Sequence, residues 1–183
     1  KGNFMKLLTL FLTIAITAMI SMAVPAIADE IDDYRISADD QISITVFNET
    51  DLSINKVRVS GNGSISMPLL GQVAIEGHTI AEVENKISTL LLEGYLKKPN
   101  VTVTITEYRP FYINGEVKKP GSYPYKKNLT VEKAVSLAGG FSERASRTTI
   151  SLVSEDDKRF VKAVALNDKI KPGDVITVSE SFF

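Results

Sequence analysis

The sequence predicts an α+β protein in which two small domains follow an amino-terminal leader. Most of the chain consists of short segments in which apolar and polar residues alternate, as is typical of half-buried strands. Only two segments have the spacing of three and four between apolar residues that indicates a helix. We expect a leader at 1–28, a first domain at 29–108 and a second domain at 109–183, because the 155 residues after the leader suffice for two small domains.

The leader is predicted from an uncharged, mostly apolar run at Leu7–Val24 that follows the basic Lys6. Ala26 and Ala28 supply the small-x-small pattern of a signal-peptidase site, so we expect cleavage after Ala28. An uncleaved anchor is the alternative, since an 18-residue apolar run just spans a bilayer. Four hydroxyl residues within the run and Pro25 after it favour cleavage.

Charge and cysteine content narrow the possible functions. Without Lys1 and Lys6, the chain keeps 19 basic and 22 acidic residues, a net charge of −3. No long block of one sign attracts nucleic acid, so we expect no nucleic-acid partner. The sequence has no cysteine, so the fold depends on its hydrophobic core, and we expect no lipid attached through a thiol.

The first domain is expected to contain one sheet-forming region on each side of a helix. Apolar residues at Ile42, Ile44 and Val46 alternate with polar ones, and the same alternation recurs near position 103. The turn Gly61-Asn62-Gly63 is expected to supply positive-φ residues for a tight reversal. We expect strands at 42–47, 54–59, 64–67, 72–75 and 101–108.

The helix between these strands is predicted to begin after Thr79. Thr79 and Glu82 have the spacing of a capping box, in which each side chain satisfies a free backbone N–H of the first turn. Gly94 is a plausible terminator. The apolar positions that define its buried face are Ile80, Val83, Ile87, Leu90 and Leu91.

The second domain is expected to begin at the strand break Arg109-Pro110. A short helix at 130–138, capped by Thr130 and ended by Gly139-Gly140, interrupts a series of strands. A short helix across a curled sheet is the β-grasp arrangement, which buries one sheet face. We expect strands at 111–117, 122–125, 148–153, 159–164 and 175–178.

These motifs, in this order, resemble the Wza-like outer-membrane polysaccharide exporter family. The first half resembles its polysaccharide-export α/β domain, through YRISADDQISITVF, the run at 52–87 and KKPNVTVTI. The second half resembles the soluble-ligand-binding (SLBB) β-grasp domain, through INGEVKKPGSYPY, LTVEKAVSLAGGF and KPGDVITV. The resemblance covers residues 34–180.

The chain departs from the family pattern in three places. Ala38-Asp39-Asp40 stands where the family usually has Pro-Gly-Asp, and we expect this change to alter a turn rather than the fold. The lipid-bearing cysteine is missing, and the sequence stops at Phe183, where pore-forming members continue into a membrane-crossing helix. We therefore expect a periplasmic member that relies on another protein to cross the outer membrane.

A basic and aromatic rim around the second turn is the candidate contact surface for a glycan or another subunit. Tyrosine rings stack on sugars, and lysines pair with uronate or phosphate groups. An ordinary solvated hairpin is the alternative. The terminal Phe182-Phe183 is a second candidate, because exposed aromatics favour docking. The rim comprises Lys118, Lys119, Tyr123, Tyr125, Lys126 and Lys127.

No catalytic, metal or cofactor site is expected. His78 lacks the companions that a zinc site requires. Asp39 and Asp40 are adjacent, whereas glycoside cleavage needs two carboxyl groups facing each other across a cleft. Gly139-Gly140 follows a helix, whereas a phosphate loop precedes one.

The resemblance implies a non-enzymatic component of a capsular or exopolysaccharide export machine in a Gram-negative periplasm. It implies a homo-oligomeric ring that forms a conduit for polysaccharide. The expected partners are an inner-membrane polysaccharide co-polymerase with tyrosine-kinase activity and an outer-membrane barrel protein. The alternatives are a monomeric carbohydrate-binding or sensing module and, less well supported by the residues, a hydrolase.

Overall fold

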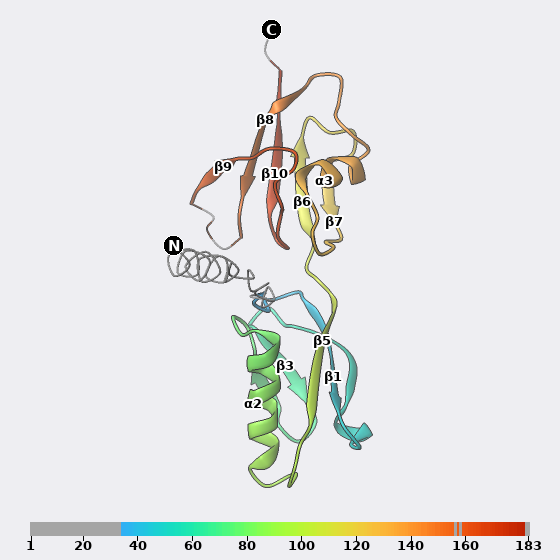
Figure 1. Ribbon diagram of the computed structural model, residues 1–183, viewed down its shortest axis with the longest axis vertical. Helices are drawn as coiled ribbons and strands as arrows, with labels where there is room; N and C mark the ends of the chain where they lie inside the picture. Colours follow the sequence, from blue (N-terminus) through green and yellow to red (C-terminus); the bar gives the residue numbers. More distant parts are fainter. Residues whose placement is uncertain (1–33, 156, 158, 182–183) are drawn as a thin grey trace, which may run out of the picture. The chain divides into compact units, whose positions relative to one another are not determined.

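The computed structural model describes residues 34–155, 157 and 159–181, which form an α+β protein with two separate hydrophobic cores (Figure 1). The α+β class predicted from the sequence is confirmed. One core belongs to residues 36–103 and the other to residues 111–178. We call 34–108 the first half and 109–181 the second half. The leader, with Ala26 and Ala28, and the terminal Phe182 and Phe183 lie outside the described residues.

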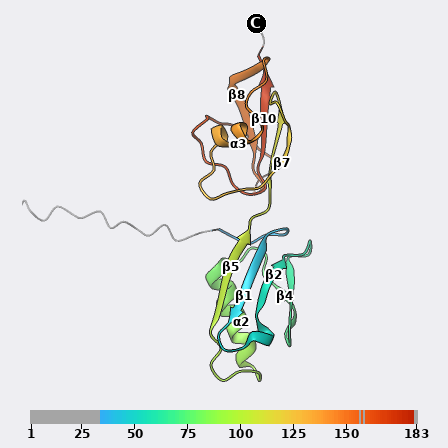
Figure 2. The ribbon, with the colours of Figure 1, turned by 90° about the vertical axis from the view of Figure 1, so that its right-hand side faces the viewer.

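The first half is built on a three-stranded antiparallel sheet. Strand β1 (Gln41–Val46) lies between β2 (Ile54–Arg58) and β5 (Val101–Glu107), as Figure 2 shows. Helix α2 (Ile80–Leu92) packs against β5. A 3-10 turn η1 (Thr50–Leu52) connects β1 to β2. The alternating residues Ile42, Ile44 and Val46 are all buried, as the pattern predicts.

The turn at residues 61–63 differs from the expectation. It does not close a hairpin, because β2 pairs with β1, whereas β3 (Ser64–Met67) pairs with β4 (Gly71–Ala74) in a second sheet. Only Gly63, at φ +73°, has a positive φ within the turn. The chain still reverses tightly there, since Gly63 N donates to Ser60 O at 2.8 Å and Ser60 N donates to Ser64 O at 2.9 Å. The side chain of Asn62 reinforces this turn, because its Oδ1 accepts hydrogen bonds from Ser60 Oγ at 2.5 Å and from Ser64 N at 3.2 Å.

The capping box of α2 is confirmed. Glu82 N donates to Thr79 Oγ1 at 3.3 Å, and Thr79 N donates to Glu82 Oε2 at 2.8 Å. The hydrogen bond from Thr79 N lowers the pKa of the Glu82 carboxyl. Val83, Ile87 and Leu91 are buried on the predicted face.

The second half is a five-stranded mixed sheet with helix α3 (Val131–Leu137) against it. Its strand order is β7 (Gly121–Tyr123), β6 (Phe111–Gly115), β10 (Val175–Glu180), β8 (Ala145–Val153) and β9 (Val161–Ala163). The central pair β6 and β10 is parallel and the other pairs are antiparallel, consistent with the expected β-grasp. Strand β8 begins three residues before the predicted start, because Ala145 pairs with Glu180 beyond an irregularity in the ladder.

Candidate functional site

The two halves are connected by a polar network around the buried side chain of Asp40. This carboxylate follows the turn where the family motif usually has glycine, and Asp39 there adopts φ +68°, a left-handed conformation that glycine takes freely. Asp40 Oδ2 accepts hydrogen bonds from the Tyr34 hydroxyl at 2.5 Å and from Ser37 N at 2.9 Å. Asp40 Oδ1 accepts one from Arg109 N at 2.8 Å. The buried charge is therefore held by several donors, as a buried carboxylate requires.

Arg109 extends this network into the second half. Its Nη1 donates to the Tyr34 hydroxyl oxygen at 2.8 Å and lies 3.3 Å from Asp40 Oδ2, while its Nε donates to Glu155 Oε2 at 2.6 Å. The ion pair passes close to Gly173 of the KPGD turn. A Cβ on Gly173 would lie 1.7 Å from Glu155 Oε2 and 3.0 Å from Arg109 Nε. A side chain at position 173 would therefore displace the Glu155 carboxylate from Arg109, and the φ of +84° there also favours glycine.

The electrostatics of the network keep Tyr34 protonated. Burial, together with the hydrogen bond to Asp40, raises the pKa of the Tyr34 hydroxyl well above its usual range. The hydroxyl therefore stays a donor to Asp40 at any physiological pH. Tyr34 also begins a chain of edge-to-face ring contacts, with Tyr34 and Tyr108 centroids 5.0 Å apart and Tyr108 and Tyr125 centroids 5.4 Å apart.

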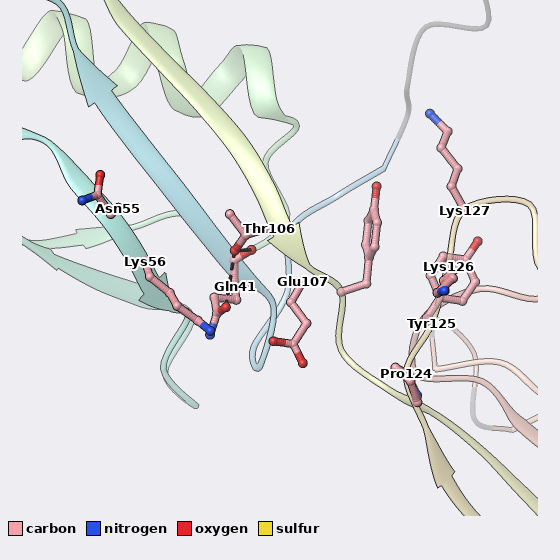
Figure 3. Close-up of a pocket in the computed structure, with 10 residues that line it drawn as sticks. Gln41, Asn55, Lys56, Thr106, Glu107, Pro124, Tyr125, Lys126 and Lys127 are labelled. Atoms are coloured by element: carbon pink, nitrogen blue, oxygen red, sulfur yellow. Dashed lines mark hydrogen bonds between the residues drawn. The ribbon is translucent and has the colours of Figure 1, made fainter.

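Beside this aromatic chain lies an open hollow of about 610 Å³, which we call the junction depression (Figure 3). Strands β1, β2 and β5 contribute residues from the first half, and the loop after β7 contributes residues from the second. Its lining residues are Gln41, Asn55, Lys56, Thr106, Glu107, Tyr108, Pro124, Tyr125, Lys126 and Lys127.

The lining of the junction depression is suited to binding. Three lysines and one glutamate line it, together with two side-chain amides, a threonine hydroxyl and two tyrosines. The hydroxyl of Thr106 donates to the backbone oxygen of Gln41 at 3.1 Å, which fixes its position on the wall. Burial raises the pKa of Tyr125, so its hydroxyl is a neutral hydrogen-bonding group. These groups can hydrogen-bond, stack and neutralise negative charge.

In residues 34–155, 157 and 159–181, no three His, Cys, Asp or Glu side chains gather as a metal site. Over that same part of the chain, no helix is both long and apolar enough to cross a membrane.

The structure divides the rim predicted from the sequence. Tyr125, Lys126 and Lys127 line the junction depression. Lys118 and Lys119 are exposed elsewhere, and their backbone N–H groups donate to Gly140 O and Ala138 O at the end of α3.

Tyr123 has a packing role. Its ring stacks on Phe111 with centroids 5.9 Å apart, and its hydroxyl donates to Lys119 O at 2.6 Å.

Sequence reasoning missed the side of the depression that comes from the first half. Strand alternation places Thr106 on the side opposite the buried Val101 and Val103, but it gives no sign of which distant loop Thr106 faces. The lining residues that were missed are Gln41, Asn55, Lys56, Thr106, Glu107 and Tyr108.

Fold and site together define a protein of two linked α+β modules with a lysine-bearing depression where they meet. Comparison with known families identifies the two modules. Residues 28–106 match the polysaccharide biosynthesis/export proteins and residues 110–161 match the SLBB domain. The chain belongs to the Wza-like polysaccharide biosynthesis/export family, as its motifs predict.

Relatives in three bacteria are similar to this chain. The exopolysaccharide production protein ExoF of Rhizobium meliloti is 31% identical over an alignment that covers 98% of this chain and 48% of the relative. The EPS I polysaccharide export outer membrane protein EpsA of Ralstonia solanacearum is 26% identical, over 78% of this chain and 45% of the relative. EpsA of Ralstonia nicotianae is 25% identical, over 80% and 47%. The chain thus spans about half the length of these relatives.

Proposed function

We propose that this protein is a non-enzymatic component of a machine that exports capsular or extracellular polysaccharide. The observation that carries the proposal is that both modules match the family, one directly after the other. The names of the relatives, an exopolysaccharide production protein and polysaccharide export outer membrane proteins, support the same role. We place it in the periplasm of a Gram-negative bacterium, with the leader cleaved after Ala28 and the modules divided between residues 108 and 109.

The mechanism that we propose is assembly. Copies of the chain form a closed ring through head-to-tail contacts, since a heterologous interface either closes or grows into a filament. The ring surrounds a passage for the glycan and abuts an inner-membrane polysaccharide co-polymerase with tyrosine-kinase activity, while an outer-membrane barrel completes the route. Residues of the rim and the terminal Phe182-Phe183 make glycan or subunit contacts. Glycan affinity is weak, because a conduit that binds tightly does not conduct.

Deletion of the coding sequence from its host tests the export role. We expect extracellular polysaccharide to fall sharply and to return when the full chain is supplied from a plasmid. Unchanged secretion in the deletion strain contradicts the proposal.

Native mass spectrometry of the purified chain, alone and with membranes that contain the co-polymerase, tests the ring. A closed oligomer of one size is expected in at least one of the two samples. A monomer in both, combined with retained glycan binding, favours the carbohydrate-binding or sensing module.

A further inference from the structure

The junction depression is cationic on a chain that is slightly acidic overall. The whole chain has a net charge of −1, yet Lys56, Lys126 and Lys127 line the depression and Glu107 alone opposes them. Glu107 already has a cationic neighbour outside the depression, since Arg58 Nη2 lies 3.9 Å from its carboxylate. A local excess of positive charge favours a ligand that carries negative charge.

Two of the lysines, Lys56 and Lys126, lie on opposite sides of the junction depression. Lys56 comes from β2 and Lys126 from the loop after β7, with Glu107 between them (Figure 3). Within the described part of the chain, the side chains of Lys56 and Lys126 make no hydrogen bond or ion pair. Both ammonium groups are therefore available to a ligand that extends across the depression.

The uncharged lining residues indicate what kind of anion fits. Asn55 presents an exposed side-chain amide, and the Thr106 hydroxyl, which donates to Gln41 O, keeps its oxygen as an acceptor. Such groups pair with sugar hydroxyls, because an amide offers both a donor and an acceptor and a hydroxyl oxygen accepts. The rings of Tyr108 and Tyr125 add apolar surface with a polar tip, which suits the two-sided character of a sugar ring. An acidic peptide would use the lysines but leave most of these groups unused.

We propose that the junction depression binds a short segment of a carboxylated glycan. Lys56 and Lys126 pair with carboxylates on the sugars, and Asn55 and Thr106 hydrogen-bond to hydroxyls between them. The site differs from the rim predicted from the sequence, because it uses the first half and leaves out Lys118 and Lys119. That the bound glycan is the exported polysaccharide rests on the proposed function. That the depression binds a carboxylated glycan does not rest on it.

Nuclear magnetic resonance titration of the isotopically labelled full chain tests this assignment. The probes are a linear galacturonate tetrasaccharide, the neutral cellotetraose and a tetraglutamate peptide. We expect the galacturonate oligomer to shift resonances of depression residues and to bind more tightly than the other two probes. Raising the salt concentration weakens this binding, because the contacts are exposed charge pairs.

Matched double variants locate the site. We expect Lys56→Gln/Lys126→Gln to weaken galacturonate binding about tenfold, since each exposed charge pair changes an affinity a few-fold. The control Lys97→Gln/Lys98→Gln removes the same charge at two exposed lysines outside the depression and should change binding less than about twofold. The assignment is overturned if both double variants lose binding equally or if the galacturonate oligomer does not bind at all. It is also overturned if cellotetraose binds equally well or tetraglutamate binds more tightly. The secretion assay reads the export role separately, so the two failures are distinguishable.

Discussion

Arg109 N donates a 2.8 Å hydrogen bond to Oδ1 of Asp40, and the Arg109 guanidinium lies 3.3 Å from Oδ2 of the same carboxylate. The two residues are 69 positions apart in the chain. Asp40 is fully buried and the Arg109 side chain is only 10% exposed. The residue at the strand break between the two modules is thus the partner of a buried charge in the first.

Removing the Arg109 side chain should strongly destabilise the folded protein. We expect Arg109→Ala to lower the free energy of unfolding by about 3–5 kcal/mol, because it leaves Asp40 buried with an uncompensated charge. Urea unfolding followed by circular dichroism measures the change. The control is Arg159→Ala, which removes an exposed arginine paired with Asp157 at 3.3 Å and should cost less than about 1 kcal/mol. Equal costs in the two variants would show that the Asp40–Arg109 pair has no special role.

A side chain at Gly173 would meet both a strained backbone and close neighbours, whereas a side chain at Gly140 would meet only the strained backbone. Both Gly173, at φ +84°, and Gly140, at φ +89°, have left-handed backbones, but only Gly173 has neighbours within 4 Å of a built Cβ. We expect Gly173→Ala to destabilise the protein by about 1–3 kcal/mol more than Gly140→Ala, because the methyl group displaces Glu155 from Arg109. Thermal unfolding compares them. The excess should shrink when Glu155→Ala is added, and an undiminished excess would point to a different cause.

Asp39 has glycine-like geometry without being glycine. Its φ of +68° is strained for most side chains, although aspartate tolerates it better than others. We expect Asp39→Gly to stabilise the protein by about 0.5 kcal/mol, as relief of strain exceeds the extra entropy of the unfolded chain. Ala38→Gly, one residue earlier and without a positive φ, should destabilise instead. Chemical denaturation with the same sign for both changes would contradict this account of the turn.

Asp174 makes stability depend on pH in the direction opposite to most carboxylates. Burial raises its pKa above the ordinary 3.8, although the Lys171 N–H, which donates to Oδ2 at 2.7 Å, opposes the rise. Among the described residues, Oδ1 has no hydrogen-bond partner. The folded protein therefore holds this proton more tightly than the unfolded chain. The contribution to stability is present below pH 3.8 and is lost as the pH rises through the folded-state pKa.

The variant Asp174→Asn tests this sign. We expect it to raise the free energy of unfolding more at pH 7 than at pH 3, because the wild-type protein loses this contribution to its stability as the pH rises. Denaturant titrations at both pH values measure the difference. Asp168→Asn is the control. Like Asp174, Asp168 accepts a backbone hydrogen bond, from Ala165 N to Oδ2 at 2.9 Å, but its side chain is only half-buried. A larger gain at pH 3 than at pH 7 for Asp174→Asn would reverse the assigned direction.

Local patterns in the sequence predicted most of the fold. Alternation identified β1 and β5, and the Thr79–Glu82 spacing identified the start of α2, because both signals depend on residues close together in the chain. The partner of β2 was not predictable from the Gly61–Gly63 turn, since pairing is decided by distant strands. The start of β8 was missed for the same reason, because Ala145 becomes a strand residue only through its pairing with Glu180.

The candidate site was predicted only in part, for a related reason. Tyr125, Lys126 and Lys127 were recognised as basic and aromatic neighbours on one loop. Their counterparts Asn55 and Lys56 lie on a strand with unremarkable polarity, and only the folded chain brings them to the same depression. Arg109 was interpreted as a strand break, and its contact with Asp40 had no local signal.

Photocrosslinking in the host cell tests most directly whether this protein contacts polysaccharide in transit. A benzophenone amino acid replaces Asn55 in the depression, or Lys97 in the exposed segment after α2 as the control. After irradiation of polysaccharide-producing cells, the protein is recovered and its glycan content is measured. The account predicts glycan-linked protein for the Asn55 variant and little for the Lys97 variant. Absence of linked glycan in an Asn55 variant that still supports secretion, or equal labelling at both positions, would contradict it.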